Sequence, residues 1–252
     1  MTSPVLIKIS GHELSDDVFL TEIAAFIRDY PAPVVIVHGG GAEITKMQEL
    51  MGITPRYIDG LRVTDAESLA MVEMVLCGVV NKRLVRHLMN AGLDALGLSG
   101  ADRGLVRGRK ISPEMEFTGT VASVRDDIIL AFLEEGITPV IAPVCMDVDS
   151  NLNVNADVVA GAIAQAIGAS RTIFISNVEG VLINGVPVQK LTSDDVRKHI
   201  QDGIIYGGMI PKVNTALEML DAGVPEVVIT NLKGLQTHGG TVFVKDTQIV
   251  KS

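Results

Sequence analysis

Short aliphatic runs alternate along the chain with longer segments whose apolar residues follow a helical period. The runs are continuously apolar, which is typical of strands that helices cover on both faces. The pattern therefore predicts an α/β protein, a three-layer αβα sandwich with a mainly parallel central sheet. Strands are expected at residues 5–9, 34–38, 95–100, 137–144, 172–178, 226–230 and 241–244.

Capping residues mark several of the intervening helices. Acidic residues follow Thr64 and Thr192, where the positive end of a helix dipole favours them. Residues 101–125 lack a helical period and carry turn signals, which predicts a β-hairpin. Helices are expected at residues 16–29, 42–51, 156–167 and 193–202, with two more beginning at 64–67 and near Val213.

No repeat or low-complexity linker divides the chain. Residues 1–252 are expected to form a single domain, long enough to bury a substantial core. A second series of strands and helices begins near residue 170. We therefore expect two lobes, residues 1–170 and 171–252, within that domain.

Composition and charge narrow the class of protein. The chain is 47% hydrophobic and 20% charged, with a net charge of −9, which disfavours a nucleic-acid or anionic-membrane partner. Its apolar stretches are too short to span a bilayer, and the N-terminus does not have the pattern of a signal peptide. Cys77 and Cys145 have no metal-ligand or CxxC spacing and are expected to be buried thiols in a reducing cytoplasm.

Glycines follow the first two predicted strands. Lys8 stands inside the apolar run VLIKI, just before Gly11, and such a lysine is costly unless its ammonium reaches water or meets an anion. In VVIVHGGGAEI, residues 34–44, a strand leads through three glycines into a helix. That junction offers backbone N–H groups to an anion, with a plain tight turn as the alternative. His38 is expected to be packed or hydrogen-bonded rather than a catalytic base.

Two further polar stretches precede predicted helices. In NLNVNAD, Asn153, Asn155 and Asp157 alternate before an apolar helix, which exceeds the need of one N-cap, although capping with an Asx-turn is the simpler interpretation. In IIYGGMIPK, residues 204–212, Lys212 stands at a glycine-rich helix entrance and is either an anion contact or an ordinary exposed lysine.

The four stretches together favour phosphoryl transfer. They place two lysines, two glycine turns and a carboxylate at strand ends of an α/β sheet, where ligands bind. Phosphoryl transfer requires mainly positioning and neutralisation of charge. The standard nucleotide motifs are incomplete, because Ile44 replaces the last glycine of G-x-G-x-x-G and no G-x-x-x-x-G-K-[ST] occurs.

Six motifs in this order resemble those of the amino acid kinase family, and most closely its acetylglutamate kinase branch. The likeness runs nearly end to end. The motifs are K-x-G-G at 8–11, HGGG at 38–41, GLRVT at 60–64, VNK at 80–82, N-x-N-A-D at 153–157 and GGM-x-x-K at 207–212.

The resemblance implies ATP-dependent phosphorylation of the γ-carboxylate of N-acetyl-L-glutamate in arginine biosynthesis, with ATP and Mg²⁺ as cofactors. It implies that Lys8 and Lys212 stabilise the transferring phosphoryl group and that Asp157 holds both lysines. The acceptor would be bound by Gly40, Gly41, Arg62 and Asn153, with Arg62 on its α-carboxylate. Nucleotide contacts are implied for Gly11, Asn177, Val178, Glu179, Gly180, Val181, Leu182, Ile204, Ile205 and Tyr206. No residue is predicted to ligate a metal.

The chain departs from the family pattern at three places. Ser10 replaces the first glycine of K-x-G-G, and Asn177 stands where most relatives have aspartate. The first strand begins by residue 5, without the N-terminal helix that arginine-inhibited hexameric relatives use. We therefore expect an arginine-insensitive homodimer.

Two other functions are considered. Segments 73–85, 97–100 and 176–180 resemble the sister kinase that acts on carrier-protein-linked aminoadipate or glutamate in lysine biosynthesis. The basic stretch RGLVRGRK, residues 103–110, would suit an acidic carrier, but a solvated hairpin also explains it, and GLRVT favours the free substrate. A non-catalytic nucleotide or amino-acid sensor would not need Lys8, Asp157 and Lys212 together.

Overall fold

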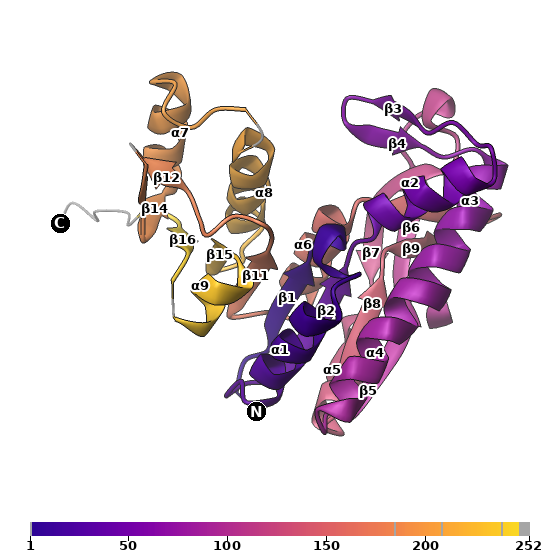
Figure 1. Cartoon of the computed structure of the whole chain (residues 1–252), viewed down its shortest axis with the longest axis horizontal. Helices are drawn as coiled ribbons and strands as arrows, with labels where there is room; N and C mark the ends of the chain where they lie inside the picture. Colours follow the sequence, from indigo (N-terminus) through magenta and orange to yellow (C-terminus); the bar gives the residue numbers. More distant parts are fainter. Residues whose placement is uncertain (1, 184, 208, 238, 247–252) are drawn as a thin grey trace.

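Figure 1 shows the computed structural model of the chain, which describes residues 2–183, 185–207, 209–237 and 239–246. Its centre is an eight-stranded sheet in the order β14-β16-β15-β11-β1-β2-β8-β5. Neighbouring strands are parallel except β15 and β16, so the prediction of a mainly parallel sheet is confirmed. The strands are β1 (Val5–Ile9), β2 (Val34–His38), β5 (Ala95–Ser99), β8 (Thr138–Ala142), β11 (Arg171–Ile175), β14 (Lys190–Thr192), β15 (Glu226–Thr230) and β16 (Thr241–Val244).

Helices cover both faces of the sheet, as the apolar strands predict (Figure 1). Leu6 and Val37 enter a core cluster with α5, α6 and α8, whereas Ile7 and Ile36 enter a second cluster with α1, α4 and α9. The helices are α1 (Asp17–Arg28), α2 (Gly41–Leu50), α3 (Ala66–Glu73), the π-helix η2 (Met74–Val80), α4 (Asn81–Asn90), α5 (Asp126–Glu134), α6 (Ala156–Ala166), α7 (Ser193–Gln201), α8 (Met209–Asp221) and α9 (Leu232–Gln236). Short 3-10 turns are η1 (Gly11–Glu13), η3 (Asp102–Gly104) and η4 (Pro113–Met115).

Smaller β elements extend from this frame. The predicted hairpin is confirmed as β6 (Val106–Lys110) against β7 (Thr118–Val124), and it closes a small barrel with β9 (Val144–Met146) and β10 (Asn151–Val154), which the sequence pattern did not predict. Two further hairpins were also not predicted. They are β3 (Arg56–Ile58) with β4 (Leu61–Val63) and β12 (Leu182–Ile183) with β13 (Val186–Pro187).

One helix start was predicted wrongly. The helix expected near Val213 begins at Met209, so Lys212 lies in its first turn and not ahead of it. Pro211 is tolerated in the first turn, because it lacks only an N–H that would have no partner within the helix. Gly208 of the IIYGGMIPK stretch lies outside the described residues.

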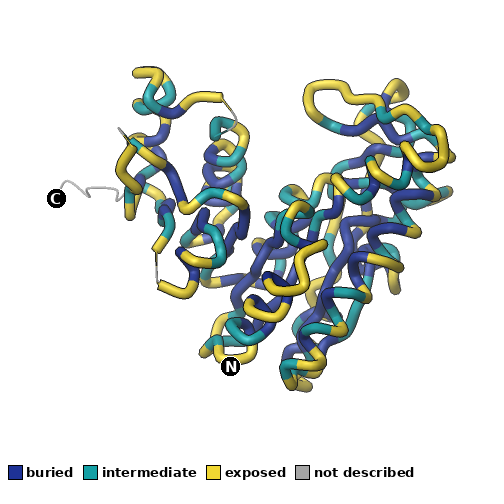
Figure 2. Tube along the Cα trace, viewed as in Figure 1, coloured by how far each residue is buried: buried dark blue, intermediate teal, exposed yellow. Residues whose placement is uncertain are grey.

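The carboxyl ends of β1, β2 and β11 meet at one edge of the sheet. Lys8 pairs in register with Val37 on one side and Phe174 on the other, so the segments after the three strands lie side by side. Figure 2 shows the strands buried. At the same end of the molecule β3 is exposed, whereas Arg62 and Val63 of β4 are buried. None of the helices in the described ranges is long and apolar enough to cross a membrane.

Candidate active site

Lys8 lies at the centre of the sheet and meets a carboxylate there. Its side chain is only 10% exposed, and its Nζ lies 2.6 Å from Oδ1 of Asp157. Alternation along β1 points Lys8 to the same face as Leu6, toward α6, where Asp157 is the second residue of the helix. Asn155 caps that helix by accepting a hydrogen bond from the amide of Asp157. Lys8 also donates to the hydroxyl of Ser10 at 3.3 Å.

Lys212 approaches the same place from α8. A small cavity of about 110 Å³ is lined by both lysines, Asp157, Ser10 and Ser176. Lys212 donates to Ser176 Oγ at 3.4 Å and to Asn177 Oδ1 at 3.3 Å, while the 2.6 Å ion pair of Asp157 is with Lys8. Burial, followed by the positive charge of Lys8, lowers the pKa of Lys212, and Asp157 opposes that shift.

Close packing explains some, but not all, of the glycines after β1 and β2. A Cβ on Gly11 would lie 2.6 Å from the backbone nitrogen of Gly40, and a Cβ on Gly40 would lie 2.5 Å from Cδ2 of Leu76. Only Gly41 has open space where a side chain would be. Backbone packing therefore explains Gly11, and the Leu76 side chain occupies the place where a Gly40 side chain would lie.

The predicted acceptor-binding residues lie around one cavity of about 510 Å³. Gly40, Gly41, Arg62 and Asn153 all line it, together with Lys8, Gly11 and Asp157. Asn153 extends from β10 and donates from its side-chain amide to Thr64 Oγ1 at 2.9 Å. The structure thus brings four distant motifs of the sequence to one cavity.

Arg62 is a second buried cation of this cavity, beside Lys8. It is 9% exposed, donates to Gln48 Oε1, to Thr45 Oγ1 at 2.8 Å and to the Gly41 carbonyl at 3.1 Å, and lies 5.0 Å from the Tyr57 ring centroid. No carboxylate of the described residues lies within 4.0 Å of its guanidinium nitrogens. Burial lowers the pKa of Arg62.

His38 is a packed residue, as expected. It is fully buried, its Nδ1 contacts the Gly39 carbonyl at 2.9 Å, and its Nε2 lies 3.1 Å from the amide nitrogen of Asn81. An amide NH₂ donates, so this arrangement fits a neutral ring with its proton on Nδ1. Burial lowers the pKa of His38 to about 4.

The predicted nucleotide segments follow β11 and precede α8, but their side chains differ in accessibility. Tyr206 is 75% exposed and Asn177 is exposed, whereas Val181 and Ile205 are buried in the core. The amide of Val181 already donates to Thr241 Oγ1, and a Cβ on Gly180 would lie 2.7 Å from the same oxygen. Val181 and Ile205 therefore support this region rather than present side chains to it. The remaining positions are Val178 and Ile204, which are half-buried, and Glu179 and Leu182, which are exposed.

Several residues that contact the site's cations were not found by sequence reasoning. Gln48, Thr45 and Tyr57 surround Arg62, and Ser176 contacts Lys212. Gln48 left one signal, because it falls four residues after the buried Ile44 and so lies on the inner face of α2. A polar residue on such a face needs a buried partner.

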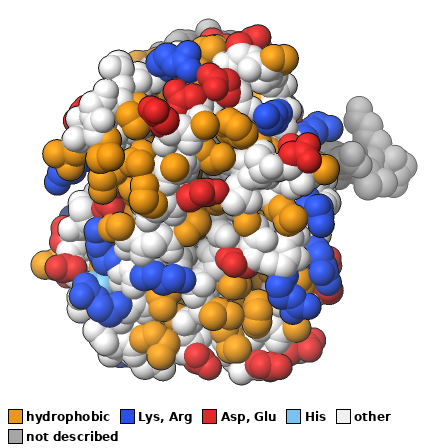
Figure 3. All heavy atoms as spheres, turned by 90° about the vertical axis from the view of Figure 1, so that its right-hand side faces the viewer, with side chains coloured by type: hydrophobic (Ala, Val, Ile, Leu, Met, Phe, Trp, Pro, Cys, Tyr) orange, Lys and Arg blue, Asp and Glu red, His pale blue; other side chains and the backbone are white. Residues whose placement is uncertain are grey.

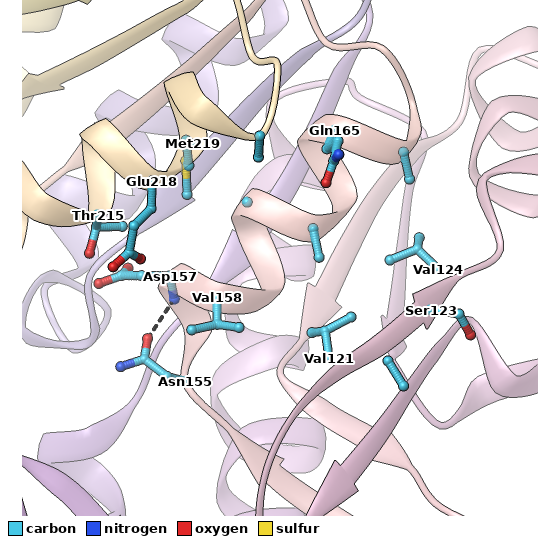
Figure 4. A pocket seen from close by; sticks show the side chains of 15 residues that line it. Val121, Ser123, Val124, Asn155, Asp157, Val158, Gln165, Thr215, Glu218 and Met219 are labelled. Carbon is cyan, nitrogen blue, oxygen red and sulfur yellow. Dashed lines mark hydrogen bonds between the residues drawn. The ribbon is translucent and has the colours of Figure 1, made fainter. Parts of the chain in front are cut away.

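A groove of about 650 Å³ lies on the other side of Asp157, between β7, α6 and α8 (Figure 4). Its walls are largely apolar, with Val121, Val158 and Met219 among them, and Asp157 and Glu218 lie near each other at one end. The charged side chains of the basic stretch lie elsewhere, on β6, where Arg107, Arg109 and Lys110 are exposed. The stretch comprises part of η3 and the strand β6, and its exposed charges suit the solvated hairpin.

In the part of the chain that the structure describes, no group of three or more His, Cys, Asp or Glu residues could hold a metal ion. A metal ion at this site would therefore need ligands from water or a bound molecule.

Comparison with known proteins gives the class. Residues 3–231 match the model of the amino acid kinase family, and the chain belongs to this family. Among its relatives, an acetylglutamate kinase from Roseiflexus sp. strain RS-1 is 46% identical over 242 residues, covering 95% of this chain and 93% of that protein. An acetylglutamate kinase from Roseiflexus castenholzii is 45% identical over 258 residues, covering 99% of both. The crystal structure of smu.665 from Streptococcus mutans UA159 has a TM-score of 0.83 at 32% identity, covering 98% of this chain and 100% of that one.

Proposed function

We propose that this chain phosphorylates the γ-carboxylate of N-acetyl-L-glutamate with ATP, giving N-acetyl-L-glutamyl 5-phosphate for arginine biosynthesis. The observation that carries the proposal is the identity of 45–46% to acetylglutamate kinases over nearly the whole chain. The cavity at the strand ends suits the reaction, since its buried cations face a space that an anionic acceptor would fill.

Arg62 is proposed to bind the α-carboxylate of the acceptor. Its guanidinium is buried in the cavity wall without a carboxylate partner in the described residues, and a planar fork of donors matches a carboxylate. Asn153 lines the same cavity and is assigned to the acetamido side of the substrate. Gly40 and Gly41 provide a wall without side chains, along which the γ-carboxylate can approach the phosphoryl group.

The transfer step needs no general base, because the γ-carboxylate is already ionised at neutral pH. A carboxylate oxygen bonds to the γ-phosphorus of ATP, the bond from that phosphorus to the β,γ-bridging oxygen breaks, and its electron pair leaves with ADP. The main obstacle is repulsion between two anions, so Lys8 and Lys212 are proposed to stabilise the transferring group. Asp157 fixes Lys8 through its ion pair.

The nucleotide is assigned to the segments after β11 and before α8, next to Lys212. Gly11 would face the phosphates, and the exposed side chains of Asn177 and Tyr206 are available to the nucleotide. Mg²⁺ is proposed to be held by the phosphates and water, and would offset phosphate charge when bound. This division assigns residues 1–170 to the acceptor and dimerisation lobe and residues 171–252 to the nucleotide lobe of one domain.

A cytoplasmic homodimer, insensitive to arginine, is proposed as the working form. Met74 and Val79 are 53% and 45% exposed on η2, and Figure 3 shows apolar side chains gathered on the side of the molecule where α3 and α4 lie. Such patches favour contact with a second copy. A molar mass of one chain or of six chains by light scattering, or a large change in activity with added arginine, would contradict this form.

The reaction can be tested by trapping its product. The purified protein is incubated with ATP, Mg²⁺ and N-acetyl-L-glutamate in the presence of hydroxylamine, which converts an acyl phosphate into a coloured hydroxamate. We expect hydroxamate only when all three components are present. L-glutamate, L-aspartate and a carrier-linked acceptor serve as parallel arms. Turnover of one of these without turnover of N-acetyl-L-glutamate would overturn the proposal, and absence of turnover in every arm would favour a sensor.

A further inference from the structure

Arg62 is held entirely by neutral acceptors. A backbone carbonyl, the Thr45 hydroxyl and the side-chain oxygen of Gln48 receive its hydrogen bonds. Buried arginines are ordinarily paired with carboxylates, because an uncompensated charge is expensive away from water. At 9% exposure Arg62 is an exception to this rule among the described residues.

Gln48 is itself fixed in place. It is 1% exposed, and its amide nitrogen donates to the Ser68 hydroxyl at 2.8 Å. The backbone N–H of Ser68 donates in turn to Oδ1 of Asp65, the N-cap residue of α3. Since the amide nitrogen of Gln48 is bound to Ser68, its oxygen must face Arg62. The chain of contacts therefore sets both the position and the orientation of this neutral acceptor.

The charge of Arg62 is consequently left for a ligand. The lysine, arginine and acidic side chains that line the 510 Å³ cavity are Lys8, Arg62 and Asp157. Lys8 and Asp157 already form an ion pair. Arg62 is the remaining cation of the three. Cavity walls of low polarisability strengthen its attraction for a carboxylate that displaces water.

We propose that Gln48 is a positioning residue that determines acceptor specificity, because it orients Arg62 while leaving its positive charge unpaired for the α-carboxylate of the acceptor. This inference rests on the proposed function and adds to it a reason for an amide at position 48. A glutamate of the same shape would form an internal ion pair with Arg62. The Ser68 hydroxyl could then donate to the new carboxylate, so the local packing would be kept.

The decisive variant is Gln48→Glu. We expect the KM for N-acetyl-L-glutamate to rise at least tenfold, the KM for ATP to stay within twofold, and the melting temperature to stay equal or rise. If Gln48 had only a structural role, its replacement would not weaken acceptor binding while leaving the melting temperature equal or higher. The matched control is Gln189→Glu, which adds the same charge at an exposed position and is expected to change neither KM.

A substrate analogue isolates the charge of the α-carboxylate. N-acetyl-L-glutamate α-amide keeps the γ-carboxylate that is phosphorylated but lacks the α-carboxylate charge. The parent protein is expected to prefer the acid over this amide by at least tenfold in kcat/KM, and Gln48→Glu is expected to lose most of that preference. Retention of the full preference in Gln48→Glu, or a KM for the acid within twofold of the parent, would overturn the inference.

Gln48→Met keeps the inference testable if the glutamate variant fails to fold. Methionine has a similar volume but offers Arg62 no carboxylate, so this variant is expected to lose some stability and to retain the preference for the acid. Loss of that preference in Gln48→Met would contradict a role in preserving charge. If the parent protein does not phosphorylate N-acetyl-L-glutamate at all, the proposed function fails. That result differs from a failure of the Gln48 inference, in which the parent protein is active but the variants do not behave as expected.

Discussion

Lys8 and Lys212 line the same small cavity, but they are held differently. Lys8 lies toward the proposed acceptor side of the site and Lys212 toward the proposed nucleotide side. Lys8 is 10% exposed and forms a 2.6 Å ion pair, whereas Lys212 is half-buried and has contacts of 3.3 and 3.4 Å. The same contrast extends outward. Arg62, Gln48 and His38 lie in buried hydrogen-bonded networks, while Asn177 and Tyr206 of the proposed nucleotide side are exposed.

If acceptor and nucleotide bind as proposed, the difference means that the acceptor side is preorganised and that the nucleotide side is completed by its ligand. Preorganised donors need little rearrangement when charge develops, which makes them effective in a transition state. Exposed side chains become ordered only when the ligand binds, which reduces the affinity for that ligand. Substitutions of such side chains are therefore expected to be tolerated. Substitutions on the acceptor side should therefore cost more than substitutions on the nucleotide side.

The largest expected effect is that of Lys8→Ala. Loss of this buried cation is expected to lower kcat about 10³-fold, or about 4 kcal/mol, whereas Lys212→Ala is expected to cost about 10²-fold. Hydroxamate formation at saturating substrates measures both, with Lys233→Ala as the control at an exposed lysine. A loss below tenfold for Lys8→Ala would remove its transition-state role, and a larger loss for Lys212→Ala would reverse the comparison.

The next effect concerns pH and stability. Because burial lowers the pKa of His38 to about 4 from 6.5, the folded state disfavours the charged ring. Its contribution to stability is fully present above pH 6.5 and is lost as pH falls toward 4, by about 3 kcal/mol. Urea unfolding across this range measures the loss. His38→Gln cannot titrate and is expected to flatten the curve, so an unchanged slope in that variant would assign the loss to other groups.

The glycine turn gives a matched pair of smaller effects. Gly11→Ala brings a methyl group against the Gly40 backbone and is expected to cost about 1–3 kcal/mol of unfolding free energy. Gly41→Ala meets open space and is expected to leave stability unchanged while raising the KM for the acceptor, since its methyl group enters the cavity. Chemical denaturation and steady-state kinetics separate the two. Equal destabilisation by both variants would contradict the packing explanation.

The smallest effect is expected for Asn177→Asp, on the nucleotide side. The new carboxylate would pair with Lys212 in a partly exposed place, where such a pair contributes less than about 1 kcal/mol. We expect kcat and the KM for ATP to change by less than about threefold. A change above tenfold would show that this side is as exacting as the acceptor side.

The sequence predicted the features that lie along single strands and turns. Continuous apolar runs identified every strand of the eight-stranded sheet but one, the short β14. Lys8 was conspicuous because it interrupts such a run, and the glycines because they directly follow two of them. The short strands β3, β4, β9 and β10 were missed, since three or four residues carry too little periodicity.

The environment of Arg62 could not be predicted in the same way. Gln48 and Thr45 are polar residues of a helix, and nothing in their spacing reveals that the β3–β4 hairpin brings Arg62 against them. The motif GLRVT identified the cation through a family resemblance. Its neutral partners depend on tertiary contacts between segments that are separate in the sequence.

The place of β1 within the sheet also bears on how the protein is made. β1 pairs on one side with β2, which follows soon after it, and on the other with β11, which comes far later in the chain. Until β11 has been synthesised, the edge of β1 that pairs with it has no strand beside it. An open, apolar edge is prone to pair with other chains. A fragment that ends before residue 171 would therefore expose a fully buried strand of the enzyme as an aggregation-prone edge.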